Sequence, residues 1–206
     1  MHGILLLTLA LAQDPTEVVF GTTVVSSSGL EGKIYFIKKY PSEMPNIEKM
    51  KPKGVIYTEA LNVPPQDFTA GFPGLGDRNE WFGIDYTGRV WIETEGEYRF
   101  KLLSDDGSRL YLDDKLVIDN DGMHPPEEVS GTAVLTRGIH KLRVMYFQGP
   151  RFHVALVLSV APLGGDWKIF RTGEFQPPKD TQDLVTGEIR SIRQGVRPPP
   201  PPKVRK

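Results

Sequence analysis

The sequence predicts an all-β protein, an antiparallel β-sandwich with the outline of a flattened barrel. Apolar and polar residues alternate in short runs through residues 29–178, as they do along strands with one buried face. Gly (21 residues) and Pro (18 residues) recur between these runs, as expected for turns. No long segment shows the 3.6-residue period of an amphipathic helix.

The runs can be taken in chain order. Pro64 to Asp77 is rich in Pro and Gly and is expected to be a long surface loop. It leads to Trp81-Phe82, whose rings are expected to close one end of the core. Residues 97–102 and 141–146 alternate apolar with charged or polar side chains, which predicts half-buried strands. From Phe152 to Val160 both faces are apolar, so this strand is expected to be central or covered on both sides.

The two ends of the chain differ from its middle. An apolar run closed by Ala10-Leu11-Ala12 predicts a signal peptide over residues 1–12, and is too short for the ~20 residues that span a bilayer. The mature protein is then expected to be secreted, periplasmic or at the cell surface, with no integral membrane segment. Residues 13–28 form an N-terminal segment. Residues 179–206 are basic, contain five consecutive prolines, and are expected to be a disordered tail. The alternative is a tether to a cell wall or to a protein that reads proline.

Composition excludes several classes of function. The absence of Cys removes disulfides, thiol nucleophiles and cysteine metal sites. A net charge of −1 gives no electrostatic reason to expect nucleic acid as a partner. The four His are isolated, and no phosphate-binding or nucleophile motif is present. We therefore expect no enzyme, although the two carboxylates that a glycosidase needs cannot be recognised in a sequence.

Three blocks carry a resemblance to a known family. They are Phe82–Ile92, the run from Ser104-Asp-Asp-Gly to Leu112, and Leu116–His124. Together they resemble the PA-fourteen domain, named after the fourteen-kilodalton part of anthrax protective antigen, over about residues 29–164. The resemblance implies a β-sandwich that binds carbohydrate, as in yeast flocculins and adhesins, so a glycan or polysaccharide is the expected partner.

The resemblance also implies a site. Two adjacent aspartates of the lectin-like members, joined by a cis peptide, hold a calcium ion that binds sugar hydroxyls, and they match Asp105 and Asp106. A further family ligand is an Asn on a later loop, where this chain has Gln148. Arg109, Arg151 and Trp81 are additional candidates for sugar contact. Most aromatic side chains near the site, such as Tyr111 and Phe152, are expected to lie in the core instead.

Physical chemistry leaves two interpretations of the Asp pair open. Calcium takes 6–8 oxygen ligands, and adjacent carboxylates at a strand end with a loop carbonyl or amide are a plausible start. Alternatively, the carboxylates of Asp105 and Asp106 accept backbone N–H bonds and shape a turn.

A second acidic group, Asp119 to Gly122 with Glu128, resembles a calcium loop, but Val117 occupies the first ligand position, so a turn beside the sheet is expected.

The sequence therefore predicts a non-catalytic, calcium-dependent carbohydrate-binding module of an exported protein. A structural or protein-interaction sandwich without a ligand site is the main alternative. A small secreted glycoside hydrolase is a third.

Overall fold

The computed structural model describes residues 18–20, 23–25, 29–38, 41–150 and 152–178. The predicted signal peptide and the basic tail lie outside these residues. Strands β1 (Val18–Phe20) and β2 (Thr23–Val25) form an antiparallel pair. The described residues contain no α-helix, only the short 3-10 turns η1 (Ile47–Lys49), η2 (Phe68–Ala70) and η3 (Thr172–Glu174). None of them forms a helix long and apolar enough to cross a membrane.

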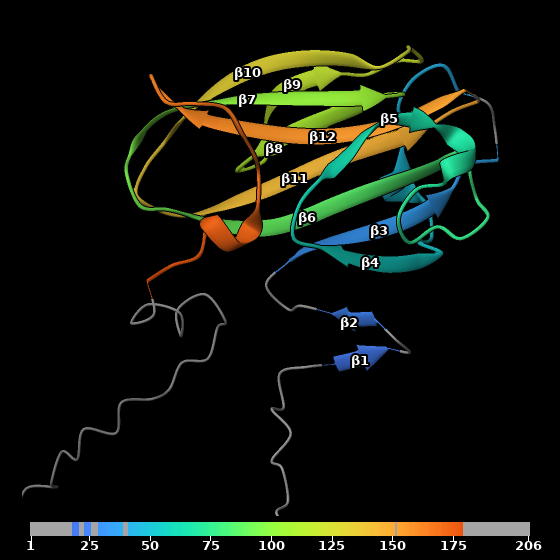
Figure 1. Cartoon of the computed structure of the whole chain (residues 1–206), viewed down its shortest axis with the longest axis horizontal. Coiled ribbons are helices and arrows are strands. Elements are labelled where there is room, and N and C mark those ends of the chain that lie inside the picture. The colour runs from blue at the N-terminus through green and yellow to red at the C-terminus, as the bar shows by residue number, and fades with distance from the viewer. Residues whose placement is uncertain (1–17, 21–22, 26–28, 39–40, 151, 179–206) are drawn as a thin grey trace, which may run out of the picture. The chain divides into compact units, whose positions relative to one another are not determined.

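Two antiparallel sheets form the two layers of a sandwich, which confirms the predicted fold class (Figure 1). The six-stranded sheet has the order β4-β3-β6-β11-β8-β9. Its strands are β3 (Leu30–Phe36), β4 (Gly54–Thr58), β6 (Phe82–Ile92), β8 (Ser108–Leu112), β9 (Lys115–Asn120) and β11 (Gly138–Gln148). The second sheet has the order β10-β7-β12, and both β5 and β13 pair with the far side of β12. Its strands are β5 (Asn62–Asp67), β7 (Gly96–Asp105), β10 (Glu127–Leu135), β12 (His153–Pro162) and β13 (Lys168–Ile169).

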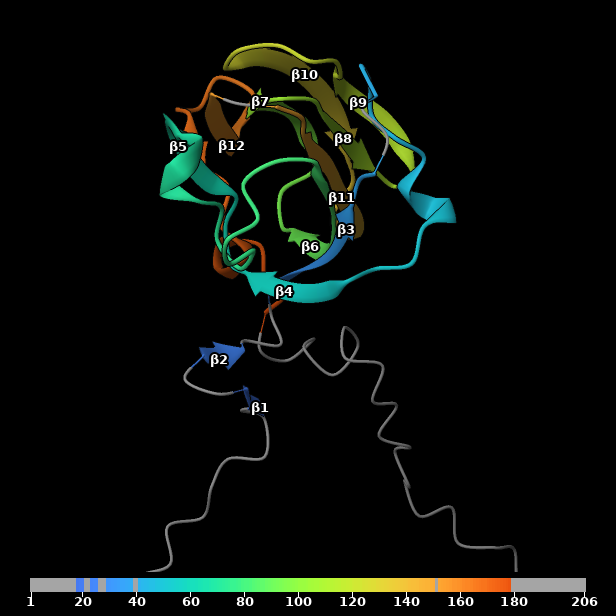
Figure 2. The same ribbon diagram turned by 90° about the vertical axis from the view of Figure 1, so that its right-hand side faces the viewer.

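The core lies between the sheets, which enclose it in the view of Figure 2. Leu102 and Leu156 of one sheet and Ile84 and Val144 of the other are completely buried. The alternation predicted for residues 97–102 and 141–146 is confirmed in its main part, since Phe100, Leu102, Leu142, Val144 and Tyr146 are buried, whereas Lys101, Lys141 and Arg143 are not. The prediction for β12 is confirmed as well, because strands pair with both of its sides.

The predicted loop from Pro64 to Asp77 is wrong in its first part. Pro64 and Pro65 lie within β5, which pairs with β12 on one side only. A proline cannot donate to a neighbouring strand, but an edge strand needs no donor on its open side. The rest of the segment is irregular, as expected, and its Phe72 is buried against the Phe82 ring, with ring centroids 5.5 Å apart.

Besides the segment of residues 68–81 between β5 and β6, three short connections cross from one sheet to the other at the same end of the sandwich, which we call the crossing end. They are Asp106-Gly107 between β7 and β8, residues 121–126 between β9 and β10, and residues 149–152 between β11 and β12. The strand registers bring them together, because Asp105 lies opposite Ala155 and Ser108 lies opposite both Asn120 and Tyr146. The turn predicted after Asp119 is therefore confirmed.

Candidate functional site

The Asp pair forms the tightest corner at the crossing end. Asp105 is the last residue of β7, and Asp106 and Gly107 lead directly into β8. The peptide bond between Asp105 and Asp106 is cis, as the resemblance implied. A Cβ on Gly107 would lie 2.5 Å from Cε1 of Phe147 and 2.8 Å from Oδ1 of Asp121, so the corner has no room for a larger residue.

Buried polar side chains tie the crossing strands together behind this corner. The Oγ atoms of Ser104 and Ser108 lie 2.7 Å apart and share a hydrogen bond between β7 and β8. The Asn120 amide donates to Ser104 Oγ at 3.0 Å and to the Glu127 carbonyl at 3.1 Å. Because buried polar groups are costly without partners, these bonds favour one arrangement of the two sheets at this end.

Gln148 lies beside the Asp pair, as predicted. The Tyr146 hydroxyl lies 2.6 Å from both the Gln148 Oε1 atom and the Asp105 carbonyl oxygen, so its proton is shared between two acceptors. The Gln148 Nε2 group donates to the His153 carbonyl at 2.9 Å and faces Asp106 Oδ2 at 3.4 Å. The amide therefore presents its nitrogen, and not its oxygen, to the carboxylates.

Both acids are nearly buried and hard to ionise. Asp105 and Asp106 are each 5% exposed. Burial, followed by repulsion from Asp106, raises the pKa of Asp105 to about 6, although His153, His124 and the Gln148 amide favour its charged form. Burial also raises the pKa of Asp106, although backbone N–H groups of Gly149 (2.7 Å) and His124 donate to its carboxylate. A cation or a proton at this corner would relieve both costs.

The turn after β9 forms a further wall of the corner. A Cβ on Gly149 would lie 3.1 Å from Asp106 Oδ2 and 3.3 Å from Met123 Sδ, so this turn and the β11–β12 loop meet over the carboxylate. Both ring nitrogens of His124 face carbonyl oxygens, those of Pro125 and Asn120. Partial burial opposes the charged ring, but these two bonds and nearby acids raise the pKa of His124.

The corner supplies some, but not all, of the oxygen ligands that a hard cation needs. Carboxylate oxygens are preferred calcium ligands, and Asp105 and Asp106 supply them side by side. Among the residues that the structure describes, no group of three or more Asp, Glu or His side chains converges on one point. The remaining ligands would have to be carbonyl oxygens, water or the ligand itself. Gln148 would add an oxygen only with its amide reversed.

The other predicted site residues have different positions. Arg109 does not face the corner, because it pairs with Asp119 (2.9 Å) and Asp121 (2.8 Å) on the outer side of the sheet. Trp81 lies at the crossing end, where its backbone N–H donates to the Gly149 carbonyl at 3.2 Å, and its side chain is partly exposed. Arg151 lies outside the described residues.

Several contributors were missed or misplaced by sequence reasoning. Tyr146 fits the alternation of β11 and is therefore indistinguishable from an ordinary core residue in the sequence. His124 and Met123 follow a turn signal, Asp121-Gly122, that indicates a bend but not what the bend covers. Phe152, expected in the core with most aromatics, is 72% exposed because β12 begins only at the next residue.

Comparison with known families decides the classification. The model of the PA14 domain, the family resembled by the sequence blocks, matches residues 26–180. The chain belongs to the PA14 domain family. No curated protein matches it in a sequence comparison.

Several solved structures share the fold. The PA14 sugar-binding domain from an RTX adhesin aligns with a TM-score of 0.60 at 19% identity, covering 70% of this chain and 96% of that domain. The A domain of epithelial adhesin 9 from Candida glabrata, in complex with Galβ1-3GlcNAc, gives a TM-score of 0.54 at 12% identity, covering 72% of this chain and 88% of that one. An anti-sigma factor domain-containing protein gives 0.57 at 21% identity and 73% coverage of this chain. The chain spans about half of that protein (49%), and all three likenesses concern the fold alone.

Proposed function

We propose that this protein is a non-catalytic carbohydrate-binding module of an exported protein and that the corner formed by Asp105 and Asp106 binds calcium. The observation that carries the proposal is the meeting of two neighbouring, nearly buried carboxylates with raised pKa values. Such a pair is unfavourable unless a cation or a proton accompanies it. Membership of the PA14 family, and a fold shared with an adhesin domain described as sugar-binding, support a glycan as the ligand.

In this proposal the chain's own residues position the acids. Asp105 and Asp106 hold the cation, while Gly149 and Tyr146 fix the Asp106 carboxylate and the Asp105 carbonyl through hydrogen bonds of 2.7 and 2.6 Å. Bound calcium supplies further coordination positions, which sugar hydroxyl oxygens can fill. Met123 and Trp81 add partly exposed apolar surface at the crossing end, which suits the C–H face of a sugar ring. A single site of this kind is expected to be weak, because sugar hydroxyls exchange one set of hydrogen bonds for another.

Calorimetric titration of the full chain with calcium, and with magnesium for comparison, tests the cation site. We expect saturable calcium binding that is lost in Asp105→Asn/Asp106→Asn. The matched control is Asp113→Asn/Asp114→Asn, which makes the same change in charge at the exposed β8–β9 turn and should retain binding. On a glycan array, the wild-type signals should disappear with a chelator. Absence of calcium binding, together with array signals that the first variant leaves unchanged, would exclude this proposal.

One observation favours a second candidate, a structural or protein-interaction sandwich. The Asp106 carboxylate already accepts a hydrogen bond from the Gly149 N–H group, and the Gln148 amide nitrogen faces it. The protein itself therefore supplies part of the stabilisation of the carboxylate charge that a cation would provide. In that case the Asp105→Asn/Asp106→Asn variant would fold normally, and its calcium binding and glycan binding would not differ from those of the wild type.

The proposal also includes export directed by residues 1–12 and contact of residues 179–206 with a cell wall or a partner protein. Both segments lie outside the described residues. Mass spectrometry of the protein recovered from its native host should give a mature chain that begins at Gln13. Recovery of the chain with residues 1–12 still attached would contradict export by cleavage.

A further inference from the structure

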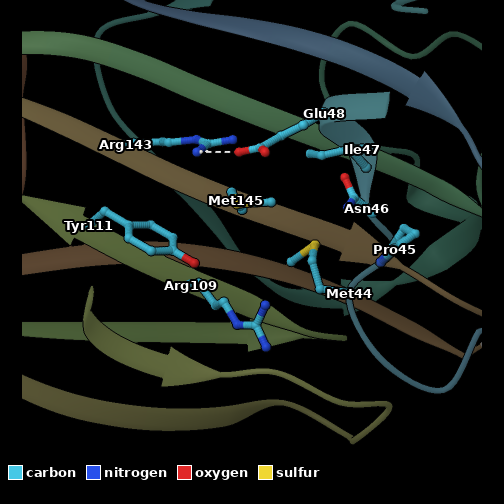
Figure 3. A pocket seen from close by; sticks show the side chains of 9 residues that line it. All are labelled: Met44, Pro45, Asn46, Ile47, Glu48, Arg109, Tyr111, Arg143 and Met145. Atoms are coloured by element: carbon cyan, nitrogen blue, oxygen red, sulfur yellow. Dashed lines mark hydrogen bonds and ion pairs between the residues drawn. The ribbon is translucent and has the colours of Figure 1, made fainter. Parts of the chain in front are cut away.

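We propose a second ligand site, for a neutral saccharide, on the outer face of the six-stranded sheet. A cavity of about 350 Å³ opens there between strands β8 and β11 and the segment around η1, and we call it the β8–β11 pocket. Its lining residues are Met44, Pro45, Asn46, Ile47, Glu48, Arg109, Tyr111, Arg143 and Met145 (Figure 3). Its size lies within the range of small-molecule sites, ~300–1,000 Å³. The β8–β11 pocket would be a glycan site in addition to the Asp105–Asp106 corner, and binding there would not require calcium.

Apolar side chains lie beneath the floor of the pocket. Met145 of β11 is 7% exposed and Ile47 of η1 is fully buried, and the two pack together with Met44 beside them. Figure 3 shows Met145 in the middle of the group, with the Met44 side chain on one flank and the Tyr111 ring on another. Thioether and aromatic surfaces of this kind can contact the C–H face of a pyranose ring.

The margin of the pocket offers polar groups that the protein leaves unused. Among the described residues, neither the Tyr111 hydroxyl nor the Asn46 side-chain amide has a hydrogen-bond partner. Figure 3 shows both groups at the pocket, with the Tyr111 hydroxyl pointing toward its middle. Together they supply donors and acceptors in the mixture that sugar hydroxyls require.

The charges around the pocket disfavour an anionic ligand. Both arginines are already paired: Arg143 makes a two-pronged contact of 2.7 and 2.9 Å with one carboxylate and a 2.9 Å bond to a second, and Arg109 binds two others at 2.9 and 2.8 Å. Their acceptors are Asp85, Glu48, Asp119 and Asp121. Two guanidinium groups against four carboxylates leave no unmatched positive charge for an anion. A hydroxyl-rich neutral ligand fits these charges and the thioether and aromatic groups of Met44, Met145 and Tyr111.

One carboxylate holds the pocket open in advance of any ligand. Asp121 accepts from Arg109 with Oδ2, and with Oδ1 it accepts from the backbone N–H of Met44 at 2.7 Å and of Gly122 at 2.8 Å. It thereby fixes the segment before η1 against the turn after β9. A wall that is already ordered reduces the entropy that binding would otherwise cost.

The methionine methyl groups allow a direct test on the full chain. Met44 and Met145 line the β8–β11 pocket, whereas Met123 lies at the Asp105–Asp106 corner. Protein labelled with ¹³C-methyl methionine is titrated, in the presence of EDTA, with methyl glycosides of glucose, galactose, mannose and N-acetylglucosamine. We expect at least one glycoside to shift the Met44 and Met145 signals saturably while the Met123 signal stays in place. If no glycoside shifts these two signals saturably, the pocket does not bind saccharides.

Variants assign any shift to the pocket. Tyr111→Phe keeps the ring and removes the hydroxyl, so affinity should fall about fivefold, which corresponds to one hydrogen bond of ~1 kcal/mol. Asn46→Ala should have a similar effect, and Tyr57→Phe, at an exposed tyrosine of β4, should have none. Unchanged affinity in both pocket variants would overturn the assignment.

The same spectra separate this inference from the proposed function. The Asp105→Asn/Asp106→Asn variant should still show the Met44 and Met145 shifts. If that variant abolishes them, the sugar binds at the corner and the second site is refuted. If only Met123 responds, and only with calcium present, the second site is refuted while the proposed function stands.

Discussion

Replacing Asp105 by Asn tests whether the corner carboxylates are kept for a ligand or for the turn itself. In the folded protein the pKa of Asp105 is about 6, against an ordinary value of 3.8, so the ionised side chain lowers stability at neutral pH. Each pKa unit corresponds to ~1.4 kcal/mol, or ~3 kcal/mol for this shift, and the desolvation cost of the buried Asn amide itself reduces the expected gain to about 1 kcal/mol. The calcium-free Asn variant should therefore be more stable than the wild type, with a melting temperature higher by roughly 2–4 °C.

The pH dependence gives the sign of the effect. Because the folded state binds the Asp105 proton more tightly than the unfolded state, the cost of ionisation disappears as the pH falls from about 6 toward 3.8. Thermal unfolding in EDTA should show the advantage of the variant near neutral pH and its loss below the ordinary Asp pKa. Adding calcium should reverse the order, since only the wild type retains both carboxylates.

A second aspartate provides a control of opposite sign. Partial desolvation opposes ionisation of the exposed Asp113, but hydrogen bonds from His140 and the Lys141 backbone outweigh it and lower the Asp113 pKa. Its ionised form stabilises the fold at neutral pH, and this contribution is lost as the pH falls through the lowered pKa, so Asp113→Asn should be destabilising at neutral pH. If Asp105→Asn is instead destabilising by the same amount at neutral and at low pH, the carboxylate shapes the turn and the argument for a cation is wrong.

Two further substitutions test the framework of the corner by denaturant unfolding. Tyr146→Phe removes the hydroxyl that serves two buried acceptors and should cost ~1–3 kcal/mol, whereas Tyr86→Phe, at a buried tyrosine with no such bond among the described residues, should cost little. Gly107→Ala brings a methyl group within 2.5 Å of the Phe147 ring and should cost more than about 2 kcal/mol, whereas Gly173→Ala, with open space around it, should be nearly neutral. Equal losses in each pair would contradict the geometry described here.

Much of the fold could be predicted from the sequence because the strands carry strong period-two patterns. The alternation in β7 and β11, and the doubly apolar β12, translate directly into buried and exposed faces. What a local pattern cannot supply is the position of a strand within a sheet. Pro64 and Pro65 indicate a loop until β5 is known to be an edge strand, where its open side needs no N–H donors.

The candidate site could be predicted only in part, and for a similar reason. Asp105, Asp106 and Gln148 were located through the family resemblance, and the structure does bring them together. The direction of the Gln148 amide depends on Tyr146 and on the His153 carbonyl, which are placed by tertiary packing. Likewise, Arg109 looks available in the sequence, because its partners lie across a hairpin whose register the sequence does not state.

The loop between β11 and β12 joins two interior strands of opposite sheets. β11 pairs with both β6 and β8, and β12 pairs with β7 on one side and with β5 and β13 on the other, so each anchor is held along both edges. The exposed residues between the anchors, Pro150 and Phe152, contribute little to the core. We therefore expect residues 150 and 152 to accept substitutions that change the surface of this end, while Gly149, which is buried against Asp106, and the supporting strands stay unchanged.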